Sequence, residues 1–152
     1  MNFSKEDIAF NDLLIKSSQS IFDQLGSGHN EKIYHKALKY ELDCLNIKSD
    51  IERHVNVNYI DSKGYEHVLE SERIDMYIFK NEYDIILELK AISGNLTSKE
   101  IEQIKKYFRE LKKKKKKIKY GVIINFPQPS SKDVKTNIEY KMIEKPNWFI
   151  LY

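Results

Sequence analysis

Three residues of this sequence, Asp75, Glu88 and Lys90, have types and spacing that fit metal-dependent chemistry. If Asp75 and Glu88 lie opposite each other in a β-hairpin, their β-carbons are about 4.5–5.5 Å apart and their charges repel. A hard cation such as Mg²⁺ offsets this repulsion, because it binds carboxylate oxygens and keeps water ligands. Lys90 follows Glu88 by two residues and therefore projects from the same strand face. Its side chain would orient an attacking water, deprotonate it as the neutral amine, or as the ammonium group stabilise charge in a phosphorane-like transition state.

The apolar residues of two segments, 72–79 and 83–91, set the register of this hairpin. A turn centred between residues 81 and 82 makes every pair on one face apolar, so that face belongs in a core. A slip of one residue would put carboxylates among isoleucines, which burial forbids, although a slip of two remains open. The predicted pairs are Ile78 with Ile85, Met76 with Leu87, and Ile74 with Leu89.

A solvent-facing hairpin is the alternative interpretation, in which Arg73, Asp75, Glu88 and Lys90 only pair with one another. Spacing alone leaves the two interpretations evenly balanced. Glu88 and Lys90 lie in an otherwise apolar strand, however, and buried charges are costly unless they are paired or bind a metal. The sequence context therefore favours the metal site.

Glu31 is a further acidic candidate, because it shares one helical stripe with Tyr34, Leu38 and Leu45. A carboxylate in a first helical turn interacts favourably with the helix dipole. It could equally reach toward the metal site. Position alone favours the helix-end explanation.

Hydrophobic periodicity predicts the elements that position these residues. A helix that stops at Gly26 is followed by a second helix and three strands, with a turn at residues 61–64. The next helix has capping-box spacing from Thr97 to Glu100. The predicted ranges are 8–25 and 34–45 for helices, 51–60, 72–79 and 83–91 for strands, 98–111 for a helix and 120–126 for a buried strand, with one or two peripheral strands in 135–152.

The strand–helix–strand unit within residues 85–126 predicts two parallel strands joined by a crossover helix. The earlier strands connect by hairpins. The sequence thus predicts an α/β fold with a mixed β-sheet flanked by helices. We expect a single domain over residues 1–152, with its core at about 25–126 and a peripheral C-terminal tail at 127–152.

Composition excludes several classes of protein. The chain has 152 residues, of which 41% are hydrophobic and 32% charged, which is typical of a globular domain. Its single cysteine, Cys44, excludes an internal disulfide or a four-cysteine zinc site built by this chain alone. The first ten residues carry charges where a signal peptide needs an apolar run, and no stretch could span a membrane. We expect an intracellular protein, cytoplasmic, or nuclear if eukaryotic or viral.

Six consecutive lysines, residues 112–117, account for the net charge of +3 and leave the rest of the chain at −3. Such a run could contact phosphates electrostatically. A solvated helix end is the slightly favoured interpretation, so charge alone does not decide the function.

An ordered set of motifs resembles the GxxExxY proteins, a branch of the PD-(D/E)XK nuclease superfamily. Any single piece is weak, whereas the ordered set, over about residues 25–126, is specific. The motifs are Gly28-His29-Asn30-Glu31-Lys32-Ile33-Tyr34, Arg73-Ile74-Asp75, Ile86-Leu87-Glu88-Leu89-Lys90-Ala91, Gln103 with Tyr107, and Gly121 through Asn125-Phe126.

The resemblance implies a restriction-endonuclease-like core in which Asp75 and Glu88 are metal ligands and Lys90 is the catalytic lysine. It also implies that Glu31 joins or supports the metal site, which reverses the interpretation from position alone. The tail after Phe126 is longer and more aromatic than the family pattern.

Three further residues match supporting positions of the family. Gln103 and Tyr107 match a helix motif that borders the active site, where they would contact substrate phosphate or hold Lys90. Tyr34 completes the GxxExxY signature. Simple packing is the alternative for Tyr107, which lies one helical turn after Gln103.

The expected function is therefore a Mg²⁺-dependent nuclease, in which Mn²⁺ substitutes and DNA is favoured over RNA. Homodimerisation is compatible with a domain this small. The alternative is a nucleic-acid-binding or protein-interaction module that keeps the fold without catalysis.

Overall fold

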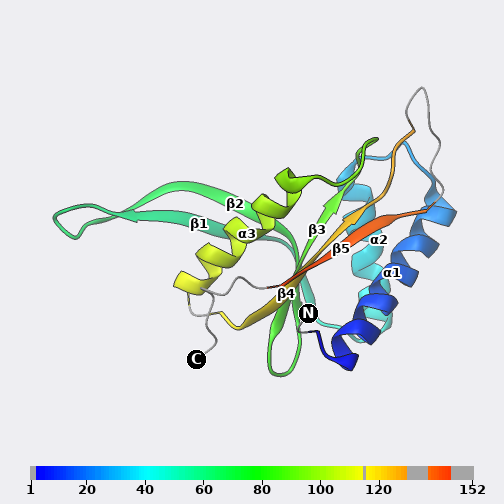
Figure 1. The fold of residues 1–152 in the computed structure, drawn as a ribbon, viewed down its shortest axis with the longest axis horizontal. Helices are drawn as coiled ribbons and strands as arrows, with labels where there is room; N and C mark the ends of the chain where they lie inside the picture. Colours follow the sequence, from blue (N-terminus) through cyan, green and yellow to red (C-terminus); the bar gives the residue numbers. More distant parts are fainter. Residues whose placement is uncertain (1–2, 115, 130–136, 145–152) are drawn as a thin grey trace.

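A computed structural model describes residues 3–114, 116–129 and 137–144 of the chain. Within these residues the chain forms three helices and five strands (Figure 1). They are α1 (Lys5–Leu25), α2 (Glu31–Cys44), β1 (Ser49–Ile60), β2 (Glu66–Phe79), β3 (Asp84–Lys90), α3 (Ser98–Lys113), β4 (Ile118–Asn125) and β5 (Glu139–Glu144).

The five strands form one mixed sheet in the order β1-β2-β3-β4-β5. β3 and β4 are parallel and α3 connects them, whereas the other neighbouring strands are antiparallel. This confirms the predicted α/β class, a mixed sheet flanked by helices as in restriction-endonuclease-like folds. β5 is the peripheral strand expected in the C-terminal tail.

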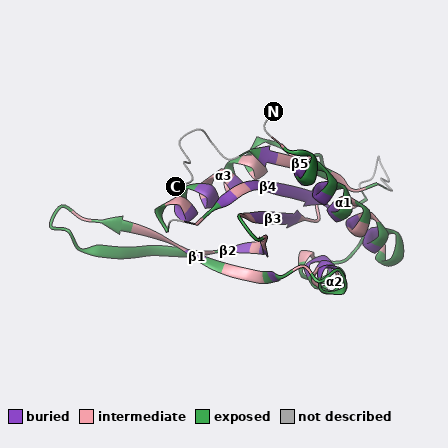
Figure 2. Cartoon of the chain, turned by 90° about the horizontal axis from the view of Figure 1, so that it is seen from below, coloured by how far each residue is buried: buried purple, intermediate pink, exposed green. Residues whose placement is uncertain are grey.

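Helices cover both faces of the sheet (Figure 2). α1 and α2 pack on one face, where the core includes Leu14, Leu38 and Leu87. α3 packs on the other face, where the core includes Ile86, Ile104 and Phe108. Gly121 on β4 permits this close packing, because an added β-carbon would lie 2.4 Å from the Cδ1 atom of Ile104.

The helix ends follow the predicted signals. Gly26 ends α1, with a φ of 72° that favours glycine and an N–H that donates to the carbonyl oxygen of Phe22. Thr97 and Glu100 form the capping box that starts α3. None of the helices in the described ranges combines the length and the apolar character needed to cross a membrane.

The β1–β2 hairpin is longer than the sequence predicts, because β2 begins at Glu66 instead of residue 72. Its outer part, residues 56–71, projects beyond the helices as an arm (Figures 1 and 2). No residue of this arm is buried. The alternation that predicts a buried face in residues 51–60 therefore places only Val55 in the core. The aromatic tail residues Trp148 and Phe149 lie outside the described residues.

Candidate active site

The predicted register between β2 and β3 is correct in the outer part of the hairpin, where Ile78 pairs with Ile85 and Met76 with Leu87. The ladder stops there. The third predicted pair was wrong: Ile74 packs in the core on the α3 side, and Leu89 packs on the α1–α2 side.

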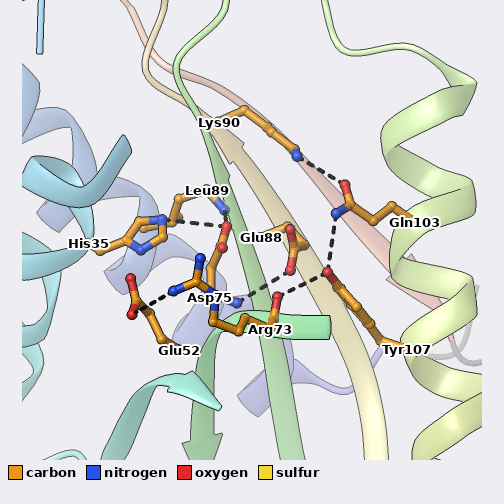
Figure 3. Close-up of polar contacts among 9 residues, drawn as sticks. All are labelled: His35, Glu52, Arg73, Asp75, Glu88, Leu89, Lys90, Gln103 and Tyr107. Atoms are coloured by element: carbon orange, nitrogen blue, oxygen red, sulfur yellow. Dashed lines mark hydrogen bonds and ion pairs between the residues drawn. The ribbon is translucent and has the colours of Figure 1, made fainter. Parts of the chain in front are cut away.

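Side-chain oxygens replace the ladder where the two strands separate. The Asp75 N–H donates to Glu88 Oε1 at 3.4 Å, and the Leu89 N–H donates to Asp75 Oδ2 at 2.7 Å (Figure 3). Each acidic side chain thus accepts from an N–H of the opposite strand, in place of a backbone carbonyl of its own strand. These bonds bring Asp75 and Glu88 together and open the sheet beside them.

On the other side of Asp75, β1 is also irregular. Its ladder with β2 passes from the pair Ile51–Met76 to the pair Arg53–Ile74 in unchanged register, and omits both Glu52 and Asp75. Glu52 has a φ of 56°, a left-handed conformation that is costly for a residue other than glycine and that often marks functional sites. Its carboxylate forms an ion pair with Arg73 at 3.3 Å. The sequence analysis missed Glu52, since nothing in the alternation of β1 signals this break.

The Asp75 carboxylate faces α2, where it meets two side chains. His35 Nε2 lies 3.5 Å from Asp75 Oδ2. One possible ligand atom from each of Glu31, His35 and Asp75 lies within 4.8 Å of the other two. We call these three residues the acidic cluster. His35 was not among the residues predicted from the sequence, although its distance of four residues from Glu31 places both on one helix face.

Tyr34 fixes the start of α2, and so the position of Glu31. Its ring is fully buried and stacks on Phe126, with centroids 4.3 Å apart. Its hydroxyl donates to the carbonyl oxygen of Gly26 at 2.8 Å. Gln128 completes the support, because its Oε1 atom accepts from the Gly28 N–H at 2.7 Å. These contacts hold the loop that leads into Glu31.

A chain of hydrogen bonds lies on the α3 side. Lys90 Nζ donates to Gln103 Oε1 at 2.9 Å, and Gln103 Nε2 donates to the Tyr107 hydroxyl at 3.1 Å. The Tyr107 hydroxyl donates to the carbonyl oxygen of Arg73 at 3.0 Å. We call Lys90, Gln103 and Tyr107 the lysine chain (Figure 3). It holds the Lys90 ammonium group in place and links α3 to β2 next to Asp75.

Glu88 lies between the acidic cluster and the lysine chain, and its side chain is buried, with the residue 1% exposed. Burial raises the pKa of its carboxyl group well above the usual value, and the negative charge of Asp75 adds to this effect. The Lys90 charge acts in the opposite direction. Burial also raises the pKa of Tyr107, so its hydroxyl stays a neutral donor. Two adjacent carboxylates in such a place are suited to binding a cation.

A pocket of about 350 Å³ opens between α2 and α3 beside these groups. Carboxylate oxygens and an imidazole line one part of it, and amide and hydroxyl groups line another, so that it can take a divalent cation together with an anionic group. Its lining residues are Glu31, Lys32, His35, Glu52, Glu72, Arg73, Asp75, Gln103 and Tyr107.

Comparisons with known proteins give the family of the chain and a similar fold. The family model of the PD-(D/E)XK nuclease superfamily matches residues 9–137. The crystal structure of SSO0001 is similar to this fold, with a TM-score of 0.53 and 15% sequence identity, over 91% of this chain and 79% of that one. No curated protein sequence matches the chain.

Proposed function

Because the chain belongs to the PD-(D/E)XK nuclease superfamily, we propose that it is a metal-dependent nuclease that hydrolyses phosphodiester bonds. One observation carries this proposal: Asp75 and Glu88 meet where β2 and β3 separate, and Lys90 projects from the same strand two residues after Glu88. Superfamily membership supports a nucleic acid as substrate. Of the nucleic acids, we propose DNA.

The acidic residues would hold the cation. The carboxylates of Asp75 and Glu31 in the acidic cluster, with that of Glu88 beside Asp75, would supply the oxygen ligands that hard divalent cations prefer. Burial and the Asp75 charge disfavour the Glu88 anion, and a bound cation would offset both. When bound, a divalent cation polarises the phosphoryl oxygen and lowers the pKa of a coordinated water. We propose Mg²⁺, with Mn²⁺ as a substitute.

Lys90 would act on the reacting groups. In the hydrolysis the oxygen of a water molecule attacks phosphorus and that water gives up a proton to solvent. The bond from phosphorus to the leaving sugar oxygen breaks, and the sugar oxygen takes up a proton from solvent. The Lys90 ammonium group would orient the water or donate to a phosphate oxygen. Gln103 holds Lys90, and Tyr107 holds Gln103, so both are positioning residues.

Within the superfamily we assign the chain to the GxxExxY branch. The contacts of Tyr34 and Gly28 support this assignment, because they show how the signature would place Glu31. A homodimer is part of the proposal, since a domain of this size offers one site for a duplex of two strands.

A cleavage assay tests the proposal. Purified protein is incubated with plasmid DNA, single-stranded DNA and RNA in Mg²⁺, Mn²⁺ or EDTA. We expect cleavage that requires metal and that falls strongly in the Asp75→Asn and Lys90→Ala variants. Asp43→Asn and Lys105→Ala are matched controls, because these side chains form ion pairs on the outer surface of α2 and α3. Cleavage in EDTA, or undiminished cleavage by the two site variants, would contradict the proposal.

The same samples separate the nuclease from a non-catalytic module. Titration calorimetry measures the binding of Mg²⁺ and of a DNA duplex beside the cleavage assay. DNA binding without any cleavage of DNA or RNA in either metal would favour the module.

A further inference from the structure

We propose that His35 is a metal ligand, and that the nitrogen it adds to Glu31 and Asp75 makes this site bind Mn²⁺ more tightly than Mg²⁺. The inference rests on the proposed function and deepens it, since it names the class of cation.

His35 is placed as a side chain that lacks its partner. It is 4% exposed, and neither ring nitrogen makes a hydrogen bond to any residue that the structure describes. Buried polar side-chain atoms nearly always have such a partner. The nearest acceptor, Asp75 Oδ2, is 3.5 Å from Nε2 and already accepts from the Leu89 N–H. A metal ion bound to one of these nitrogens would supply a partner that the described residues do not.

The surroundings of His35 indicate what this ligand is. Glu31 and His35 lie one turn apart on α2, and both face Asp75. With bonds of roughly 2.0–2.2 Å, two ligand atoms on one cation lie at most about 4.4 Å apart. The three candidate atoms are within 4.8 Å of one another, so a small movement of flexible side chains brings them together.

The ligand types then set the preference among metals. Carboxylate oxygens suit Mg²⁺ and Mn²⁺ alike, whereas an imidazole nitrogen suits transition metals. Mg²⁺ keeps its waters and takes few protein ligands. A site with one nitrogen and at least two carboxylates therefore binds Mn²⁺ more tightly than Mg²⁺.

Pulsed electron paramagnetic resonance of Mn²⁺ bound to the full chain is the direct test, because it detects a coordinated imidazole by its nitrogen coupling. We expect this coupling in the wild-type protein and its loss in His35→Gln. His29 lines a neighbouring pocket with Glu31, so His29→Gln is the matched control and should keep the coupling. Absence of nitrogen coupling, its loss in His29→Gln alone, or failure of the wild-type protein to bind Mn²⁺ would overturn the proposal.

Calorimetry with each metal tests the preference. We expect His35→Gln to weaken Mn²⁺ binding by at least about tenfold and Mg²⁺ binding much less. His54→Gln, at an exposed position on β1 whose ring contacts Ser71, should change neither affinity. Equal weakening for both metals would show a merely structural role and overturn the proposal. Thermal unfolding in EDTA reports whether His35→Gln folds; if it does not, the wild-type spectrum decides.

These results are separable from the nuclease proposal. Nitrogen coupling in a protein that cleaves neither DNA nor RNA would support His35 as a ligand and contradict the nuclease. Metal-dependent cleavage without nitrogen coupling would do the reverse.

Discussion

The two sides of the Asp75–Glu88 pair differ in how far their polar groups are satisfied. On the α3 side, each side chain of the lysine chain donates a hydrogen bond to the next, and the last bond ends at the carbonyl oxygen of Arg73. On the α2 side, the nitrogens of His35 have no hydrogen bond within the described residues. The α3 side is thus organised without a ligand, and the acidic cluster gains its full set of contacts only with one.

This difference makes it possible to test metal binding and catalysis separately, whereas a cleavage assay alone depends on both. Changes in the acidic cluster should remove metal binding and cleavage together. Changes in the lysine chain should reduce cleavage and leave metal binding nearly intact. Four predictions test this contrast, in order of decreasing effect.

Asp75→Asn should have the largest effect. We expect cleavage to fall by about a thousandfold or more, because a bound cation contributes several kcal/mol to stabilising the transition state. The asparagine can still accept from the Leu89 N–H, so the fold should persist. Calorimetry should show loss of Mn²⁺ binding in this variant. Retained metal affinity would place the cation elsewhere and break the comparison.

Lys90→Ala should reduce cleavage by roughly a hundred- to a thousandfold, as the removal of a group that stabilises developing charge does. Its Mn²⁺ affinity should stay close to that of the wild-type protein, because Lys90 supplies no metal ligand. The measurement is calorimetry beside single-turnover cleavage. A loss of metal affinity as large as that of Asp75→Asn would show that the two sides act as one unit.

Gln103→Ala should reduce cleavage by about tenfold, since it loosens Lys90 without removing it. The effect should vanish in a Lys90→Ala background, where there is no ammonium group left to position. Glu102→Ala, at an exposed site on the same helix, is the control. Additive losses in the double variant would mean that Gln103 acts on its own.

The smallest effect concerns the stability of the metal-free protein, and Glu88→Gln tests it apart from the loss of cleavage expected for a metal ligand. A carboxyl group whose pKa is raised on folding binds its proton more tightly in the folded state, so its stabilisation is lost as the pH rises above the usual value for glutamate. At pH 8, above the usual pKa of a glutamate, the buried Glu88 carboxyl group therefore lowers the stability of the metal-free protein. The neutral variant should unfold at a higher urea concentration in EDTA, by on the order of 1 kcal/mol in the free energy of unfolding. Lower stability than wild type would contradict the assigned cause.

Much of the fold follows from local signals in the sequence. Helical periodicity and capping signals predict the helices, and the order of elements predicts the parallel unit. Alternation predicts the β2–β3 register near the turn, at Ile78–Ile85, because a shift of one residue there would bury charges. The length of the arm was not predictable, since residues 66–71 include exposed Val68 and Leu69 without a buried face to pair with them.

The sequence predicts that the candidate residues lie near one another, and it predicts their geometry less well. Asp75, Glu88, Lys90 and Gln103 lie near one another as the hairpin and the resemblance suggest. The separation of β2 from β3 was not predictable, because it depends on side-chain oxygens replacing backbone acceptors. Because the strands separate there, the Asp75 side chain faces His35. The ligands predicted from the sequence were therefore carboxylates alone, without a nitrogen ligand.

A crystal structure of the protein grown with Mn²⁺ tests the central claim most directly, because anomalous scattering locates the ion. The account predicts a peak within bonding distance of the Asp75 carboxylate, on the side that faces α2. An ion bound only away from Asp75, or no ion at concentrations that support cleavage, would contradict it.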